Sequence, residues 1–294
     1  GLIHPETLIA DHPVDFGGYA PQNFDGRYRG ELRVRTALHL SLNIPVVSVM
    51  HAMGPQHLIA GLQRAGARPV VPGGKTGLAV ALGGVGITLE DLVRSYAALA
   101  NAGIAVDIRA QTAPTDGFTP QAVMGAVATW QIADILRDVP RPAGVQGAGI
   151  AYKTGTSYGY RDAWAIGYDG RHVIGVWMGR ADGTPVPGAF GGVLAAPVMF
   201  GAFARLKSQV DPIGPPPAAT LLLPTGQLPL PLQRFGAGEV SESGPQIALP
   251  PDGAVREIDR MIVKVRNGVA PFTWLANGAP VVTSHAREVD LGDL

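Results

Sequence analysis

The chain has 294 residues, a length that fits one or two domains. Its 23 basic and 23 acidic residues balance, so its charge favours neither a nucleic acid nor an anionic membrane surface as a partner. It contains no cysteine, which excludes disulfides, thiolate metal sites and a cysteine nucleophile.

The N-terminal half predicts loops followed by helices. Residues 1–30 alternate short apolar pieces with Pro, Gly and Asn, which is typical of irregular surface structure with at most one short strand. Thr88 is an expected N-cap with acidic residues behind it, and Pro45 fits the first turn of a helix. Helices are predicted over residues 32–40, 45–53, 56–65, 89–102 and 119–136.

After Pro142 the spacing of apolar residues changes from the 3.6-residue period of a helix to the two-residue period of a strand. Strands are predicted over residues 150–156, 163–168 and 172–178, with a hairpin turn at Asp169-Gly170. Residues 195–206 predict a closing helix. This order indicates an α/β (α+β) fold in which helices cover both sides of a largely antiparallel sheet.

The C-terminal third changes in composition. Residues 1–208 are expected to form the first domain, and the proline-rich residues 209–245 a linker in extended conformations. Residues 246–294 alternate in the manner of strands and predict a small β-sandwich. About fifty residues is short for such a module, so we expect the sandwich to be incomplete.

The tripeptide Lys-Thr-Gly occurs twice, at Lys75 and at Lys153. In the first copy, Gly74-Lys75-Thr76 match the last three residues of a phosphate-binding loop motif, but Pro69 stands where that motif requires its first glycine. The second copy ends a predicted strand, and Gly155 would leave the strand edge open to an incoming peptide. Lys153, Thr154 and Thr156 would offer a cation and two hydroxyls to a carboxylate, with a backbone N–H near Thr156 for an oxyanion.

A second short motif, Ser41-x-Asn43, lies in a loop between predicted helices upstream of Lys153. Its hydroxyl could pass a proton and its amide could hold a carbonyl, although Ser-x-Asn by itself is also an ordinary helix-ending turn. Penicillin-recognising serine enzymes carry Ser-x-x-Lys, Ser-x-Asn and Lys-Thr-Gly in that order. The last two are present here in that order.

Longer stretches extend this match, among them YAPQNFDGRYRGELRVRTALHLSLNIPVV and ALGGVGITLEDLVRSYAALANAG. Residues 1–207 resemble the transpeptidase domain of class A (bifunctional) penicillin-binding proteins. The phrases GTSYGYRDAWAIG and GRADGTPVPG are most similar to the penicillin-binding protein 1C branch. The segment from Pro245 resembles the C-terminal β-domain of that branch.

The resemblance implies the penicillin-recognising serine DD-peptidase/β-lactamase-like fold and a serine transpeptidase that cross-links peptidoglycan stem peptides. It implies stem peptides and β-lactams as ligands, the periplasmic face of the inner membrane as location, and no cofactor, metal or nucleic acid. The C-terminal β-domain would be available to cell-wall partner proteins. The catalytic residues implied are Ser41, Asn43, Lys153, Thr154, Gly155 and Thr156, and the substrate-binding residues are Ser157, Tyr158 and Tyr160.

No Ser-x-x-Lys occurs in the 294 residues, because Pro72, Ile150, Ala204 and Met261 stand three positions before the four lysines. The resemblance places the nucleophilic serine just upstream of Gly1, with a glycosyltransferase domain and a membrane anchor further upstream. We therefore expect the chain by itself not to form an acyl-enzyme.

Two alternatives remain. A β-lactamase-like hydrolase of the same fold would need a Glu-x-x-Leu-Asn segment, but His39 stands at the Glu position before Leu42-Asn43. A non-enzymatic module would use the C-terminal β-domain to bind a partner or a cell-wall polymer. Trp274 could then stack on a sugar, although a Trp in a strand is more often a core residue.

Overall fold

The computed structural model describes residues 3–110, 118–145, 148–233, 245–249, 261–266, 268–276 and 279–291. The chain divides into two compact units, residues 1–232 and 233–294. No helix within the described ranges combines the length and the apolar character that crossing a membrane requires.

The first unit begins with an antiparallel strand pair and three helices: β1 (Leu8–Asp11), β2 (Gly30–Arg33), α1 (Val34–His39), α2 (Asn43–Met53) and α3 (Pro55–Arg64). Two short 3₁₀ turns and two helices follow: η1 (Pro72–Gly74), η2 (Leu78–Leu82), α4 (Leu89–Ala100) and α5 (Ala126–Arg137). The unit ends with β3 (Ala151–Thr156), β4 (Asp162–Tyr168), β5 (Val173–Gly179), the π-helical turn η3 (Gly191–Ala195), α6 (Ala196–Leu206), η4 (Thr225–Gln227) and η5 (Leu230–Leu232).

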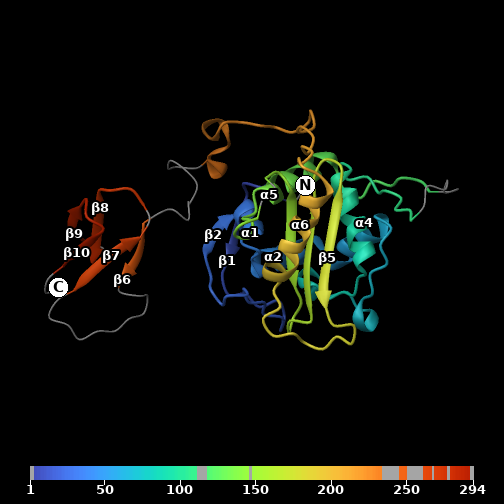
Figure 1. Ribbon diagram of the computed structural model, residues 1–294, viewed down its shortest axis with the longest axis horizontal. Coiled ribbons are helices and arrows are strands. Elements are labelled where there is room, and N and C mark those ends of the chain that lie inside the picture. The colour runs from blue at the N-terminus through green and yellow to red at the C-terminus, as the bar shows by residue number, and fades with distance from the viewer. Residues whose placement is uncertain are drawn as a thin grey trace. The chain divides into compact units, whose positions relative to one another are not determined.

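The central sheet has the order β3-β4-β5, is antiparallel throughout, and lies between helices (Figure 1). Alternate residues of β3 face opposite helices, as the two-residue period of a strand requires. Tyr152 packs edge-on against Phe200 of α6, with ring centroids 4.9 Å apart, whereas Ala151 packs with Ala133 and Leu136 of α5. The predicted antiparallel sheet with helices on both sides is confirmed.

Local signals read from the sequence account for two features of this core. Thr88 Oγ1 accepts the backbone N–H of Asp91 at 3.1 Å, so Thr88 is the N-cap of α4 as predicted. The β4–β5 turn is held by Asp169, whose Oδ1 accepts the N–H groups of Arg171 and His172 at 3.0 and 2.8 Å. The hairpin at Asp169-Gly170 is confirmed.

Two sequence predictions were wrong at their N-terminal ends. The helix expected over 119–136 begins at Ala126, because Val123 and Met124 direct their N–H groups to the carbonyl of Gly103, at 2.8 and 3.2 Å. The helix expected over 32–40 begins at Val34, since residues 30–33 pair with β1. In both places a partner distant in sequence provides hydrogen bonds that the local pattern does not reveal.

The second unit contains a three-stranded and a two-stranded antiparallel sheet. Their strands are β6 (Gln246–Leu249), β7 (Ile262–Arg266), β8 (Phe272–Ala276), β9 (Ala279–Ser284) and β10 (Glu288–Asp290). Val263 and Val265 of β7 share one buried cluster with Phe272 and Trp274 of β8. Trp274 is 8% exposed, which identifies it as a core residue rather than a stacking surface for a sugar. That this unit is the C-terminal β-domain of the 1C branch stays a prediction.

Candidate functional site

The site is centred on Lys153 in β3. Lys153 Nζ donates to Ser41 Oγ at 2.7 Å and to the Thr154 carbonyl at 3.1 Å. Ser41 is 112 residues upstream, in the turn between α1 and α2. The fold therefore brings the Lys-Thr-Gly and Ser-x-Asn motifs into direct contact.

Burial of Lys153 lowers the pKa of its ammonium group to about 8, from an ordinary value of 10.5. The cause is desolvation, which penalises the charged form. Near neutral pH the side chain still carries its proton in most molecules and can attract a carboxylate. Because its pKa is close to neutrality, it can also exchange that proton with Ser41 more readily than an exposed lysine would.

Ser41 is held in a left-handed backbone conformation, with φ of 54°. This conformation costs a non-glycine residue roughly 1–2 kcal/mol. Backbone hydrogen bonds from Ser41 to the Leu38 carbonyl and from Leu42 to the Ala37 carbonyl, at 3.2 and 3.0 Å, close the end of α1 around it. The strained turn points the hydroxyl of Ser41 towards Lys153.

The start of α2 is capped from a distance by Asn23, because Leu42 provides no side-chain cap. Asn23 Oδ1 accepts the backbone N–H of Asn43 at 2.9 Å. Asn23 Nδ2 in turn donates to both carboxylate oxygens of Asp11, at 2.7 and 2.9 Å, and Asp11 is fully buried. Asn43 Nδ2 donates to the Gln22 carbonyl at 2.7 Å. The Ser-x-Asn turn is thus attached to β1 through one buried amide.

The rest of the Lys-Thr-Gly strand lies at the outer edge of the three-stranded sheet. A Cβ added to Gly155 would meet nothing closer than Trp164 Cβ at 3.6 Å, so the protein itself leaves this position open. Thr156 Oγ1 accepts the N–H of Gly191 at 3.1 Å, which joins β3 to η3. Gly191 has no room for a side chain, because its Cβ would lie 2.3 Å from the Gly155 carbonyl oxygen.

The three predicted substrate-binding residues have different surroundings. Ser157 Oγ accepts the N–H of Asp162 at 2.8 Å and closes the β3–β4 turn. Tyr158 is fully exposed. Tyr160 packs edge-on against Phe190 and Phe24, with ring centroids 5.2 and 6.4 Å apart. Their role in binding a substrate stays a prediction.

Two weaker sequence features lie outside this site. Lys75 is exposed in the loop between η1 and η2, without the strand that precedes Lys153. His39, which stands where a β-lactamase of class A would carry its glutamate, has Nε2 2.8 Å from the Ile135 carbonyl oxygen. A ring nitrogen that donates to a buried backbone carbonyl is not free to activate water.

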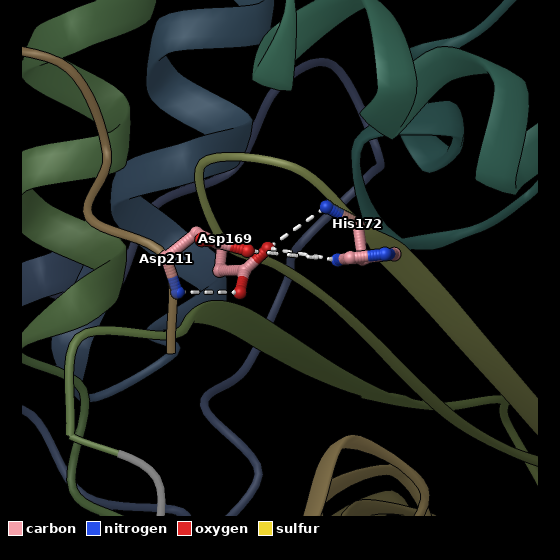
Figure 2. Close-up of side chains that lie close together, drawn as sticks. All are labelled: Asp169, His172 and Asp211. Atoms are coloured by element: carbon pink, nitrogen blue, oxygen red, sulfur yellow. Dashed lines mark hydrogen bonds and ion pairs between the residues drawn. The ribbon is translucent and has the colours of Figure 1, made fainter. Parts of the chain in front are cut away.

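A second polar cluster was not anticipated from the sequence. Asp169, His172 and Asp211 lie within ligand distance of one another near the β4–β5 turn (Figure 2). Lys207 already supplies a cation there: its Nζ donates to Asp169 Oδ2, to Asp211 Oδ2 at 2.7 Å and to His172 Nδ1 at 3.0 Å. This cluster joins the hairpin turn to the end of α6 and to residue 211.

Residues 1–198 match the family model described as the penicillin binding protein transpeptidase domain. Over 204 residues, or 68% of this chain and 26% of the relative, the sequence is 44% identical to penicillin-binding protein 1C of Escherichia coli strain K12. It is 30% identical to penicillin-binding protein 1B of Vibrio cholerae over 215 residues, or 63% of this chain and 27% of the relative. The chain thus spans about a quarter of the length of these relatives.

Solved structures share the fold. Penicillin-Binding Protein 1A from Haemophilus influenzae superposes with a TM-score of 0.60 at 19% identity, covering 73% of this chain and 41% of that one. PonA1 from Mycobacterium tuberculosis, solved in complex with penicillin V, gives a TM-score of 0.60 at 21% identity, covering 72% of this chain and 66% of that one. The fold, the family model and the sequence identity agree, and the chain belongs to the penicillin-binding protein transpeptidase domain family.

Proposed function

We propose that this domain grips the D-Ala-D-Ala end of a peptidoglycan stem peptide for a serine DD-transpeptidase reaction. The observation that carries the proposal is the 2.7 Å contact between Lys153 Nζ and Ser41 Oγ. It joins two motifs that penicillin-recognising enzymes use together. In the proposed complex the peptide lies along the open edge of β3 and its terminal carboxylate faces Lys153, Thr154 and Thr156.

The chemistry divides between two sets of residues. Lys153 and the threonine hydroxyls bind the carboxylate by charge-assisted hydrogen bonds. Ser41 and Asn43 would move a proton and hold the scissile carbonyl. In the complete reaction a serine attacks the D-Ala-D-Ala amide, and D-Ala leaves with the proton that the serine gives up. An amine of a second stem peptide then attacks the acyl ester, the ester bond to the serine breaks, and a proton of the amine returns to the serine.

The 294 residues contain no Ser-x-x-Lys, so we infer that this chain binds the donor peptide but does not acylate. A serine supplied by preceding residues of a longer protein would complete the site. We also propose that such a protein carries the glycosyltransferase and the membrane anchor expected for class A enzymes, and that it acts on the periplasmic face of the inner membrane, where peptidoglycan lies. β-Lactams, which imitate the D-Ala-D-Ala end, would enter the same site.

The test is a titration of the ¹⁵N-labelled chain with N-acetyl-D-Ala-D-Ala, with N-acetyl-L-Ala-L-Ala as the stereochemical control. We expect the D-peptide to shift the backbone amides of residues 153–156. Replacing Lys153 with alanine should weaken binding about tenfold or more, since hydrogen bonds to charged groups contribute roughly 1.5–3 kcal/mol. Lys75→Ala, in the other Lys-Thr-Gly copy, is the matched control and should leave the affinity unchanged.

Binding that is equal for both enantiomers, or that is insensitive to Lys153→Ala, would contradict the proposed site. A fluorescent penicillin tests the second part of the proposal. We expect no covalent band with this chain, and a band with a longer chain that carries Ser-x-x-Lys. A stable adduct on the 294-residue chain would show that another group acts as the nucleophile.

A further inference from the structure

Two indoles and a carboxylate lie on the face of the sheet that carries Lys153. Gly155 of β3, Trp164 of β4 and Trp177 of β5 are register partners, so they form one row across the three strands. Lys153 and Gly155 share a face because they are two residues apart. The Trp164 and Trp177 ring centroids are 6.2 Å apart at an interplanar angle of 53°. The row thus leads from the open position at Gly155 onto an aromatic surface.

Asp162 adds a negative charge to this surface. It is two residues before Trp164 in β4, and its Oδ1 accepts the Trp177 Nε1 proton at 2.8 Å. The ring of Trp177 covers Gly179, where a Cβ would lie only 2.7 Å from Trp177 Cζ2. The hydrogen bond to Asp162 therefore fixes the Trp177 ring, and the absence of a side chain at Gly179 leaves room for it. Within the described part of the chain, no hydrogen bond to Asp162 Oδ2 is found, so this oxygen can accept a hydrogen bond from a ligand.

Helix α4 covers the neighbouring row of the sheet but leaves this one accessible. A Cβ on Gly175 would lie 2.5 Å from Val93 Cγ2 and 3.0 Å from Leu89 Cδ1, so the helix packs directly on that row. Two residues further along β5, Trp177 is 36% exposed. The indole row thus lies next to the row of Lys153, Ile166 and Gly175, and Trp177 gives it a partly solvent-accessible aromatic surface.

We propose that Asp162, Trp164 and Trp177 form a subsite for a primary alkylammonium group, the amino-bearing side chain of the acceptor stem peptide. Indole faces attract cations, their apolar surface accommodates the methylene arm, and the Asp162 carboxylate complements the charge. Neither Lys153, which donates to Ser41, nor Arg180, whose Nε lies 3.8 Å from Asp182 Oδ1, forms an ion pair with Asp162, and the neighbouring Arg161 is exposed. The proposal rests on the proposed function, which requires an amine next to the acyl group.

The decisive experiment follows the indole N–H resonances of the ¹⁵N-labelled chain, which has four tryptophans. N-acetyl-L-lysine amide is titrated first, and N-acetyl-L-norleucine amide, which has a methyl group in place of the aminomethyl group, is the matched control ligand. We expect the lysine compound to shift Trp164 and Trp177 but not the buried Trp274. It should bind about threefold or more tighter than the norleucine compound, as a cation over an exposed aromatic ring predicts.

Asp162→Asn is the informative variant, because the amide oxygen can still accept the Trp177 proton while the charge is removed. The lysine affinity should fall by about two- to fivefold, as the loss of an exposed ion pair predicts, with unchanged backbone amide shifts in β4 and β5. Glu288→Gln, which removes an exposed carboxylate from the second unit, should have no effect. Equal binding of the two ligands by the unmodified chain, or full affinity in a folded Asp162→Asn variant, would overturn the proposal.

The same samples separate this subsite from the donor site. N-acetyl-D-Ala-D-Ala binding that fails while lysine binding persists would count against the proposed function and leave the ammonium subsite supported. Donor binding that persists without any preference for the ammonium ligand would overturn the subsite alone.

Discussion

Lys153 Nζ and Ser41 Oγ lie 2.7 Å apart although 112 residues separate them in the chain. One group comes from an edge strand and the other from a strained turn between two helices. A hydrogen bond between such different elements forms only if separate interactions fix the position of the strand and of the turn. The predictions below concern the charge at this contact, the hydrogen bonds that hold the Ser41 turn, and the polar cluster at the β4–β5 turn.

The first prediction concerns pH. The affinity of the chain for N-acetyl-D-Ala-D-Ala should fall as the pH rises through about 8, because Lys153 loses its proton there. The ligand carboxylate is already ionised well below that pH. Lys153→Arg keeps its charge at alkaline pH, so its affinity should stay constant across the same range. Titrations at a series of pH values measure both, and a flat profile for the unmodified chain would refute the explanation.

The lowered pKa of Lys153 also determines how the stability of the chain changes with pH. Lysine in the unfolded chain keeps its proton up to its ordinary pKa of 10.5, whereas folded Lys153 releases it near 8. Between these values the unfolded state binds more protons, so the free energy of unfolding contributed by this residue rises with pH. Urea denaturation of the unmodified chain and of Lys153→Met should show this rise only in the former.

The second prediction concerns Asn23, which supports the Ser-x-Asn turn. Asn23→Ala removes the acceptor of the Asn43 N–H and takes two hydrogen bonds from the buried Asp11 carboxylate, which keeps only the backbone N–H of Arg29 at 2.9 Å among the described donors. We expect the free energy of unfolding to fall by about 2–4 kcal/mol, since a buried carboxylate loses two of its hydrogen bonds and a helix loses its cap. Where the variant folds, its affinity for N-acetyl-D-Ala-D-Ala should also fall.

Gln22→Ala is the control for this prediction, because only the backbone carbonyl of Gln22 binds Asn43 and its side chain is exposed. It should preserve stability and binding. The measurements are urea denaturation for stability and the amide titration for affinity. If Asn23→Ala behaved like Gln22→Ala, the buried amide would have no part in holding the turn.

The third prediction concerns Lys207 and Asp169. Burial alone would raise the pKa of Asp169, but hydrogen bonds from Lys207 and from backbone N–H groups outweigh it and lower that pKa. For Lys207, desolvation opposes the charge, but the bonds to Asp169 and Asp211 raise its pKa above the ordinary 10.5. The stabilisation from Asp169 is therefore present above the ordinary carboxylate pKa and is lost as pH falls through the lowered value. That from Lys207 is present below its ordinary pKa and is lost as pH rises through the raised one.

Lys207→Met should lower the free energy of unfolding by about 3 kcal/mol at neutral pH, because it leaves the buried Asp169 without its cation. Urea denaturation of the first unit measures this loss. Adding Asp169→Asn should recover part of it, since the uncompensated charge is then removed as well. A single variant as stable as the unmodified chain would mean that the backbone donors alone satisfy Asp169.

Much of the sheet and its flanking helices could be predicted from local patterns. The strands of the β3-β4-β5 sheet, the Asp169 turn and the Thr88 cap depend on residues within a few positions of one another. The strand at residues 30–33 and the late start of α5 could not be predicted, because their hydrogen bonds come from β1 and from Gly103. The roles of Asp11 and Asn23 were likewise hidden, since a lone Asp and a lone Asn in loop-like sequence carry no signal.

The sequence by itself determined which residues were candidates for the chemistry. Lys-Thr-Gly and Ser-x-Asn are short motifs that are defined by residue type and by their order along the chain. The sequence context already favoured Lys153 over Lys75, but only the tertiary structure showed that Lys153 Nζ contacts Ser41 Oγ. The tertiary structure also decided that burial lowers the pKa of Lys153 and that Trp164, Trp177 and Asp162 share its face. These properties depend on strand register, desolvation and contacts between distant segments, which arise only when the chain packs.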